Sequence, residues 1–167
     1  MPKKIIEKFM PDPKTLKNHK YLKVFGTLLE KPNLWLLNRK SAPGAFAVGL
    51  FVAWLPMPFQ MVAAAGLAIF FNVNIPVAVA LVWLTNPVTM PFMFYVAYLL
   101  GSKLMGLPSQ HFEFQLDWQW IEASIHTIGP PFLLGCLALG AISSLIGYFV
   151  IQSLWKYSIL FKWQKRK

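Results

Sequence analysis

Residues 41–102 read SAPGAFAVGLFVAWLPMPFQMVAAAGLAIFFNVNIPVAVALVWLTNPVTMPFMFYVAYLLGS, without a single Asp, Glu, Lys, Arg or His. A hydrocarbon layer about 30 Å thick is crossed by roughly 20 apolar residues in a helix, and this uncharged run is about three times that long. No soluble core needs an uncharged segment of such length. The sequence therefore predicts an all-α integral membrane protein, because backbone polar groups in lipid must be satisfied within the protein.

A second apolar run, residues 123–155, contains one titratable residue, His126, near its start. Its part from residue 132 to residue 155 is long enough to cross a bilayer as a single helix. Proline is tolerated in the first turn of a helix, so we expect Gly129-Pro130-Pro131 to begin this last span.

Prolines divide the long run into short pieces. They are Pro56, Pro58, Pro76, Pro87 and Pro91. A proline lacks a backbone donor and clashes with the carbonyl four residues earlier, so the carbonyls of Val52, Trp54 and Trp83 need other partners. The pieces between the breaks cover residues 45–55, 59–71, 77–84 and 92–100. None is long enough to span alone, and we expect kinked spans or half-helices that enter and leave on one side.

Uncharged polar side chains lie beside these breaks. They are Gln60, Asn72, Asn74, Thr85, Asn86 and Thr89. A polar group left unpaired in lipid costs several kcal/mol, so irregular backbone at membrane depth is buried in protein or lines a wet cavity. Facing half-helices build the binding sites of many transporters. These six residues and Arg39 are therefore the hypothetical substrate-binding set, and the alternative is that the prolines are kinks that serve packing.

The long run has no group that can carry a proton, whereas intramembrane proton relays are usually built from acidic, basic or His residues. A proton-driven pump is therefore not predicted. Uncharged polar groups, half-helix N-termini and the nearby Arg39 and Lys40 suit an anion or a phosphate headgroup instead.

An enzymatic site is a competing interpretation of the loop before the last span. Glu122 and His126 are four residues apart, which puts them on one helix face, and further candidates nearby are His111, Glu113 and Asp117. Such a set can bind a metal or act as acid and base, but exposed residues of an interfacial helix explain it too. Because no recognised ligand spacing is present, we predict no catalytic residue, no metal and no cofactor.

The Lys and Arg residues lie outside the two apolar runs. Of the 16, ten precede residue 41, one is Lys103 between the runs, and five follow Trp155. Each such residue near an anionic leaflet contributes about 1 kcal/mol of attraction, and an excess of them marks the cytoplasmic side. In spite of the net charge of +10, we therefore predict the bilayer and its anionic lipids as partners rather than nucleic acid, with both termini in the cytoplasm.

This orientation requires an even number of crossings. With one crossing in the last run, the long run must cross an odd number of times, although it holds two span-length halves. We expect the half around Pro56 and Pro58 to be re-entrant, because its limbs are short and meet at a Pro-x-Pro turn.

These features divide the chain into three segments. They are residues 1–40, a basic cytoplasmic or interfacial segment; residues 41–155, the membrane domain with an outer loop at 103–128; and residues 156–167, a basic cytoplasmic tail. Apolar residues at helical steps over residues 15–31 predict an N-terminal interfacial helix. In the outer loop, Asp117 is suited to cap a helix that begins at Trp118.

Small residues recur at helical intervals. The sets are Ala45, Gly49 and Ala53; Ala64 and Ala68; and Gly140, Ser143, Ser144 and Gly147. They let a neighbouring helix approach closely, either within the chain or in a second copy, so a homo-oligomer is a further candidate partner. A fainter pattern in residues 47–58 recurs in residues 78–87. It indicates either a duplicated helix–break–helix unit or chance similarity between apolar sequences.

One set of residues resembles a known family. It comprises Arg39, Ser41, Gly49, Phe51, Pro56, Pro58 and Gln60, then Asn72-x-Asn-x-Pro76 and Asn86-Pro-x-Thr-x-x-Pro91. Over roughly residues 30–155 the chain is similar to a bacterial family called domain of unknown function 2062. The resemblance implies a small multi-pass protein of the bacterial cytoplasmic (inner) membrane and supplies no activity.

Two hypotheses of function follow from these observations. The first is transport or flipping of an anionic lipid or another small anion through a cavity lined by broken helices. The alternative is a non-catalytic membrane scaffold or a partner subunit of an envelope complex, for which the small-residue faces and basic tails are sufficient.

Overall fold

The computed structural model describes residues 32–107 and 118–164, with side chains described over residues 33–107 and 127–158. Its elements are the 3-10 helix η2 (Pro32–Leu34) and the α-helices α3 (Ser41–Ala53), α4 (Gln60–Phe70), α5 (Ile75–Val82), α6 (Met90–Leu104) and α7 (Trp118–Gln164). No strand occurs in these two ranges, so the all-α prediction is confirmed for them. The interfacial helix predicted over residues 15–31 lies outside the described residues.

The helices end where the prolines predict breaks. Helices α3, α4 and α5 have 13, 11 and 8 residues, and α6 has 15. Even α6 is only about 22 Å long at 1.5 Å per residue. In the described part of the chain, one helical stretch is long and apolar enough to cross a membrane, the 32 residues Thr127–Ser158 of α7. The structure thus shows one candidate span, and the other crossings remain a prediction.

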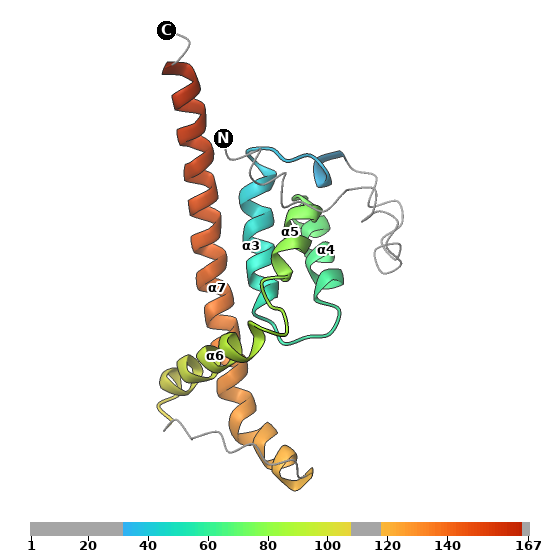
Figure 1. Ribbon diagram of the computed structural model, residues 1–167, viewed down its shortest axis with the longest axis vertical. Coiled ribbons are helices and arrows are strands. Elements are labelled where there is room, and N and C mark those ends of the chain that lie inside the picture. Colours follow the sequence, from blue (N-terminus) through green and yellow to red (C-terminus); the bar gives the residue numbers. More distant parts are fainter. Residues whose placement is uncertain (1–31, 108–117, 165–167) are drawn as a thin grey trace.

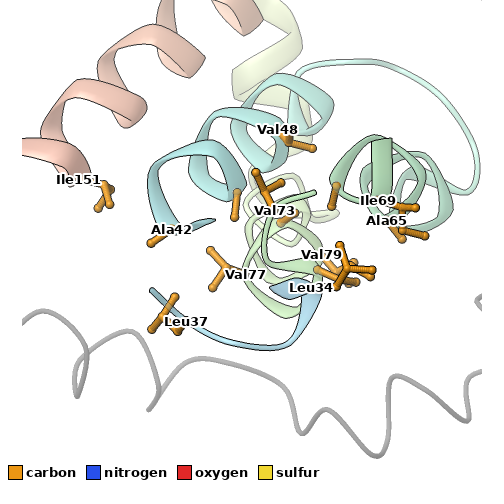
Figure 2. Close-up of a cluster of buried hydrophobic side chains, with 14 residues drawn as sticks. Leu34, Leu37, Ala42, Val48, Ala65, Ile69, Val73, Val77, Val79 and Ile151 are labelled. Carbon is orange, nitrogen blue, oxygen red and sulfur yellow. The ribbon is translucent and has the colours of Figure 1, made fainter. Parts of the chain in front are cut away.

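Helices α3, α4 and α5 form a group beside the long helix α7 (Figure 1). Helix α3 contacts α4, α5 and α7, while α6 packs against α7 farther toward its N-terminal end. The main apolar core fills the centre of the group (Figure 2). It includes Val48 of α3, Ile69 of α4 and Val79 of α5, with Ile151 joining it from α7. The four helices are thereby held as one packed unit.

The predicted small-residue faces pack inside the chain. Ala45, Ala53, Ala64 and Ala68 are all 0% exposed. A Cβ atom on Gly49 would lie 2.7 Å from the carbonyl oxygen of Ala78, so α3 and α5 meet backbone to backbone there. In α7, Gly140 faces Phe51 and Gly147 faces Leu50, both of α3. These faces join α3 to α5 and to α7, through the close helix approach that small residues allow.

The last helix differs from its predicted start. Pro130 and Pro131 lie inside α7 rather than in its first turn, and the helix already begins at Trp118. A start at Trp118 was predicted, and its expected cap, Asp117, lies outside the described residues. Figure 1 shows α7 changing direction close to its crossing with α6. Interior prolines commonly cause such kinks, and α6 packs against α7 close to this point.

That crossing depends on two glycines that the sequence analysis did not single out. A Cβ atom on Gly101 of α6 would lie 1.6 Å from the carbonyl oxygen of Pro131. A Cβ atom on Gly135 of α7 would lie 1.8 Å from the carbonyl oxygen of Ala97. Each glycine thus receives the backbone of the other helix. The spacings Ala97-x-x-x-Gly101 and Pro131-x-x-x-Gly135 were the signal available in the sequence.

We expect Gly135→Ala to lower the free energy of unfolding by about 1–3 kcal/mol or more, because the added methyl group forces α6 and α7 apart. Gly129→Ala is the control in the same helix, since no described atom beyond its chain neighbours and its own helix backbone lies within 4 Å of a Cβ placed there. Because Pro130 follows it, this substitution should not gain the full helix propensity of alanine, but it does not touch α6. Thermal unfolding of both variants in detergent measures the difference, and equal midpoints would contradict the backbone contact.

Candidate functional site

The predicted binding residues lie at two opposite ends of the short helices. Gln60, Thr85, Asn86 and Thr89 belong to the turns that follow α3 and α5 and are called the turn cluster below. The turn between α4 and α5, which holds Asn72 and Asn74, packs at the other end, where Val73 lies against Gly44 in the first turn of α3. Arg39 directly precedes α3. The structure therefore does not bring the seven residues into one site.

The turn cluster bonds to backbone carbonyls around the prolines. The hydroxyl of Thr85 donates to the carbonyl of Ala53 and so ties the end of α5 to the end of α3. The amide Nε2 of Gln60 donates to the carbonyl of Leu55 at 2.6 Å. Asn86 Nδ2 lies 3.5 Å from the carbonyl oxygen of Trp83, which Pro87 deprives of its helical partner. Of the carbonyls that the prolines were expected to free, that of Trp83 has a predicted side chain as its partner. The carbonyl of Val52 instead accepts from the backbone N–H of Leu55 at 3.0 Å, and Thr85 and Gln60 serve the neighbouring carbonyls of Ala53 and Leu55.

Asn86 and Thr89 also cap the turn that leads into α6. Asn86 Oδ1 accepts from the backbone N–H groups of Val88 at 2.9 Å and Thr89 at 3.0 Å, and the N–H of Asn86 donates to Thr89 Oγ1 at 3.0 Å. The same hydroxyl donates to the carbonyl of Leu84 at 2.6 Å. This is a reciprocal arrangement of side-chain and backbone hydrogen bonds in the turn before α6, and Pro91 follows in the first turn of that helix. The Asn-Pro-x-Thr sequence is thereby explained as a helix start.

The turn that leads into α3 repeats this arrangement. Asn38 Oδ1 accepts from the N–H groups of Lys40 and Ser41, and the N–H of Asn38 donates to Ser41 Oγ at 3.2 Å. Ser41 Oγ in turn donates to the carbonyl of Leu36 at 2.9 Å. In both cases the hydroxyl bonds to the carbonyl two residues before the Asn. Sequence analysis missed Asn38, although Asn-x-x-Ser and Asn-x-x-Thr share one spacing.

Asn72 and Asn74 end one helix and begin the next. Asn72 has φ 53°, and the N–H groups of Asn72 and Val73 bond back to the carbonyls of Ile69 and Ala68, as in a Schellman motif. Asn74 caps α5 by accepting from the N–H of Val77 at 3.0 Å. Asn74 is 0% exposed, and its Nδ2 has no partner among the described residues. Both asparagines therefore have a structural task.

A cavity of about 310 Å³, called the turn cavity, lies beside the turn cluster. Its lining residues are Met57, Phe59, Gln60, Met61, Val62, Val82, Trp83 and Thr85. Phe59 has φ 60°, which is uncommon for a residue other than glycine, and its side chain is 64% exposed. The cavity contains no charge, and the polar groups of Gln60 and Thr85 already donate to the backbone. It therefore offers little to neutralise an anion.

A second cavity lies at the opposite end, between the start of α3 and α7. It measures about 330 Å³ and is lined by Arg39, Lys40, Pro43, Tyr148, Gln152 and Lys156. It is called the basic pocket below. Of the predicted site residues only Arg39 belongs to it. Sequence analysis missed the α7 residues, whose spacing of four, Tyr148, Gln152 and Lys156, puts them on one helix face.

A third cavity, of about 370 Å³, lies between α6 and α7. It is lined by Pro91, Phe94, Tyr95, Tyr98, Ile128 and Phe132. The rings of Phe94 and Phe132 meet edge to face with centroids 5.2 Å apart. This lining is aromatic and uncharged, so it suits a hydrocarbon group better than an anion.

The proposed enzymatic residues lie mostly outside the described part. The side chains of Glu122 and His126 are not described, and neither are His111, Glu113 and Asp117. Among the side chains that are described, no three of the types His, Cys, Asp and Glu come together in a group that could hold a metal ion. The enzymatic interpretation therefore gains no support from the described residues.

We expect Thr85→Val to lower the free energy of unfolding by about 1–3 kcal/mol, because the carbonyl of Ala53 would be left buried without its donor. Thr85→Ser keeps the hydroxyl and should cost only about 0.8 kcal/mol for one lost methyl group. Unfolding titrations in detergent compare the two variants. Wild-type stability of the Val variant would show that the bond between the two turns is dispensable.

Relatives of the chain are recognisable at the level of a family. No curated protein and no solved structure shows significant similarity to it. Residues 22–164 match a family described as an uncharacterized protein conserved in bacteria, DUF2062. The match covers most of the 167 residues, including the five α-helices of the part that the structure describes, and confirms the resemblance found in the sequence. The chain therefore belongs to this bacterial family, domain of unknown function 2062.

Proposed function

We propose that the chain is a multi-pass protein of the bacterial cytoplasmic membrane that moves an anionic lipid or another small anion between leaflets, with a re-entrant hairpin formed by α3 and α4. The observation that carries this proposal is how far the short helices reach along α7. Gly140, near the middle of the candidate span Thr127–Ser158, faces Phe51, near the end of α3. If α7 crosses the bilayer, the Pro56–Pro58 turn lies close to the midplane.

Half-helices that meet near the midplane are a common way to build a transport site. Here the ends of α3 and α5 are tied by the bond from Thr85 to Ala53, and the turn cavity lies beside them. The distribution of cations supports the orientation, since Arg39 and Lys156 line one pocket and Lys103 lies at the far end of α6. These features favour both termini in the cytoplasm.

A scaffold is the second candidate function. It is favoured by the hydrogen bonds of the turn cluster, since Gln60, Thr85, Asn86 and Thr89 all serve the backbone. A scaffold needs such bonds for folding only. A transporter needs in addition a path that a ligand can use, and this difference is what an experiment can measure.

Transport is tested by lipid scrambling in reconstituted vesicles. With fluorescent phosphatidic acid in both leaflets, the wild-type protein should expose inner-leaflet label to a membrane-impermeant quencher faster than protein-free vesicles do. Met57→Trp should reduce this rate because it fills the turn cavity, whereas Val88→Trp, at a position 87% exposed and outside the cavity, should not. A wild-type rate equal to that of protein-free vesicles would favour the scaffold.

Topology is tested by labelling single cysteines in a Cys136→Ala background. We expect Leu107→Cys to react with an impermeant maleimide in whole cells and Lys156→Cys to react only after permeabilisation. Both positions are exposed. Phe59→Cys should react with a small polar reagent if water reaches the re-entrant turn. If positions 107 and 156 are labelled from the same side, the predicted topology is wrong. If Phe59→Cys does not react, the prolines are kinks packed within the protein and not part of a re-entrant turn that water reaches.

A further inference from the structure

The basic pocket is built where α3 and α7 run side by side. Gly147 lets Leu50 of α3 approach α7 closely, and the next turns of α7 carry Tyr148, Gln152 and Lys156 along the start of α3. Arg39 and Lys40 come from the capped turn before α3. Residues more than 100 positions apart in the sequence thus line one cavity of about 330 Å³, which is in the range of small-molecule sites, roughly 300–1,000 Å³.

Among the described residues, three cations and no acid line this pocket. Arg39, Lys40 and Lys156 are exposed, and the sequence contains no Asp or Glu between residues 31 and 112 or after residue 122. The hydroxyl of Tyr148 and the amide of Gln152 add neutral donors. An arginine fork and lysine ammonium groups are the side chains that bind phosphate best. The lining therefore selects for an anion with several acceptor oxygens.

The ligand would be held by side chains more than by the start of α3. The N–H groups of Lys40 and Ser41 already donate to Asn38 Oδ1. The positive end of the α3 dipole nevertheless lies at this pocket and favours a negative charge. A phosphate monoester carries about −1.5 to −2 at pH 7, against about −1 for a diester, so it matches three cations better.

The surface of α7 next to the pocket is apolar. Leu145 and Phe149 are each 59% exposed, and at about 100° per residue they lie on the side of α7 that carries Tyr148, Gln152 and Lys156. We propose that the basic pocket binds a phosphate monoester, with the hydrocarbon chain of the same lipid lying on this part of α7. This inference deepens the proposed function, and its role in transport rests on that function, whereas the binding step does not.

Binding is tested on the full-length protein purified in detergent, by native mass spectrometry. The probes are dioleoyl phosphatidic acid, which is a monoester, dioleoyl phosphatidylglycerol, which is a diester, and inorganic phosphate. We expect phosphatidic acid to bind more tightly than phosphatidylglycerol. Lys156→Gln should lower the affinity for phosphatidic acid about tenfold, which is the effect of losing one charge-assisted hydrogen bond. Adding Arg39→Gln to this variant should lower the affinity further. Lys103→Gln, an exposed lysine outside the pocket, should leave the affinity unchanged.

The outcomes separate the source of the ligand. If inorganic phosphate competes with phosphatidic acid as an equal, the pocket is a phosphate site for a free anion. If phosphate competes weakly, the lipid is the ligand. Equal binding of both lipids, or equal effects of Lys156→Gln and Lys103→Gln, would overturn the inference. If the protein scrambles lipid but does not prefer phosphatidic acid, the inference about the basic pocket fails and the proposed transport function still holds. If it binds phosphatidic acid selectively but does not scramble lipid, the transport function fails and the inference about the pocket still holds.

Discussion

The rest of the structure depends on one constraint, which is that backbone carbonyls left without a helical partner around the proline breaks need donors within the protein. Water supplies such donors in a soluble loop, but an apolar environment does not. Here Thr85 serves the carbonyl of Ala53 and Gln60 serves that of Leu55, while Asn86 and Thr89 serve their own turn. Ala53 is the last residue of α3, and Thr85 lies in the turn after α5. The hydrogen bond between them therefore also fixes how α3 and α5 lie together.

Close backbone approach is the second source of order. Apolar side chains gain little from packing when the alternative is lipid, so helices associate through contact area and weak polar contacts. Gly49 allows the contact of α3 with α5, and Gly101 and Gly135 allow that of α6 with α7. Carbonyl oxygens approach the opposing helix at each crossing, a geometry that favours Cα–H···O contacts. The glycines therefore decide which helices meet.

Local chemistry explains what could be predicted from the sequence. Prolines 56, 58, 76, 87 and 91 located the helix ends, and nearby polar side chains were identified as partners for the freed carbonyls, because both effects act within a few residues. The continuation of α7 through Pro130 and Pro131 could not be predicted in this way, because a proline indicates a local break and does not show whether the helix resumes on both sides of it. The separation of Arg39 from Thr85 could not be predicted either, because helix crossings, and not spacing along the chain, decide which residues are neighbours in space.

For the proposed function, the separation of the basic pocket from the turn cavity limits how an anion could move through this protein. Cations gather at the basic pocket, and in the described residues the next one is Lys103, beyond the uncharged turn cavity. Desolvating an unpaired anion costs far more than a few neutral hydrogen bonds return. At the turn cavity the hydroxyl of Thr85 already donates to the backbone. In the proposed transport, a phosphate that leaves Arg39 and Lys156 would therefore have to carry water or a counter-ion with it, and a protein that provided neither could only hold the proposed lipid in place.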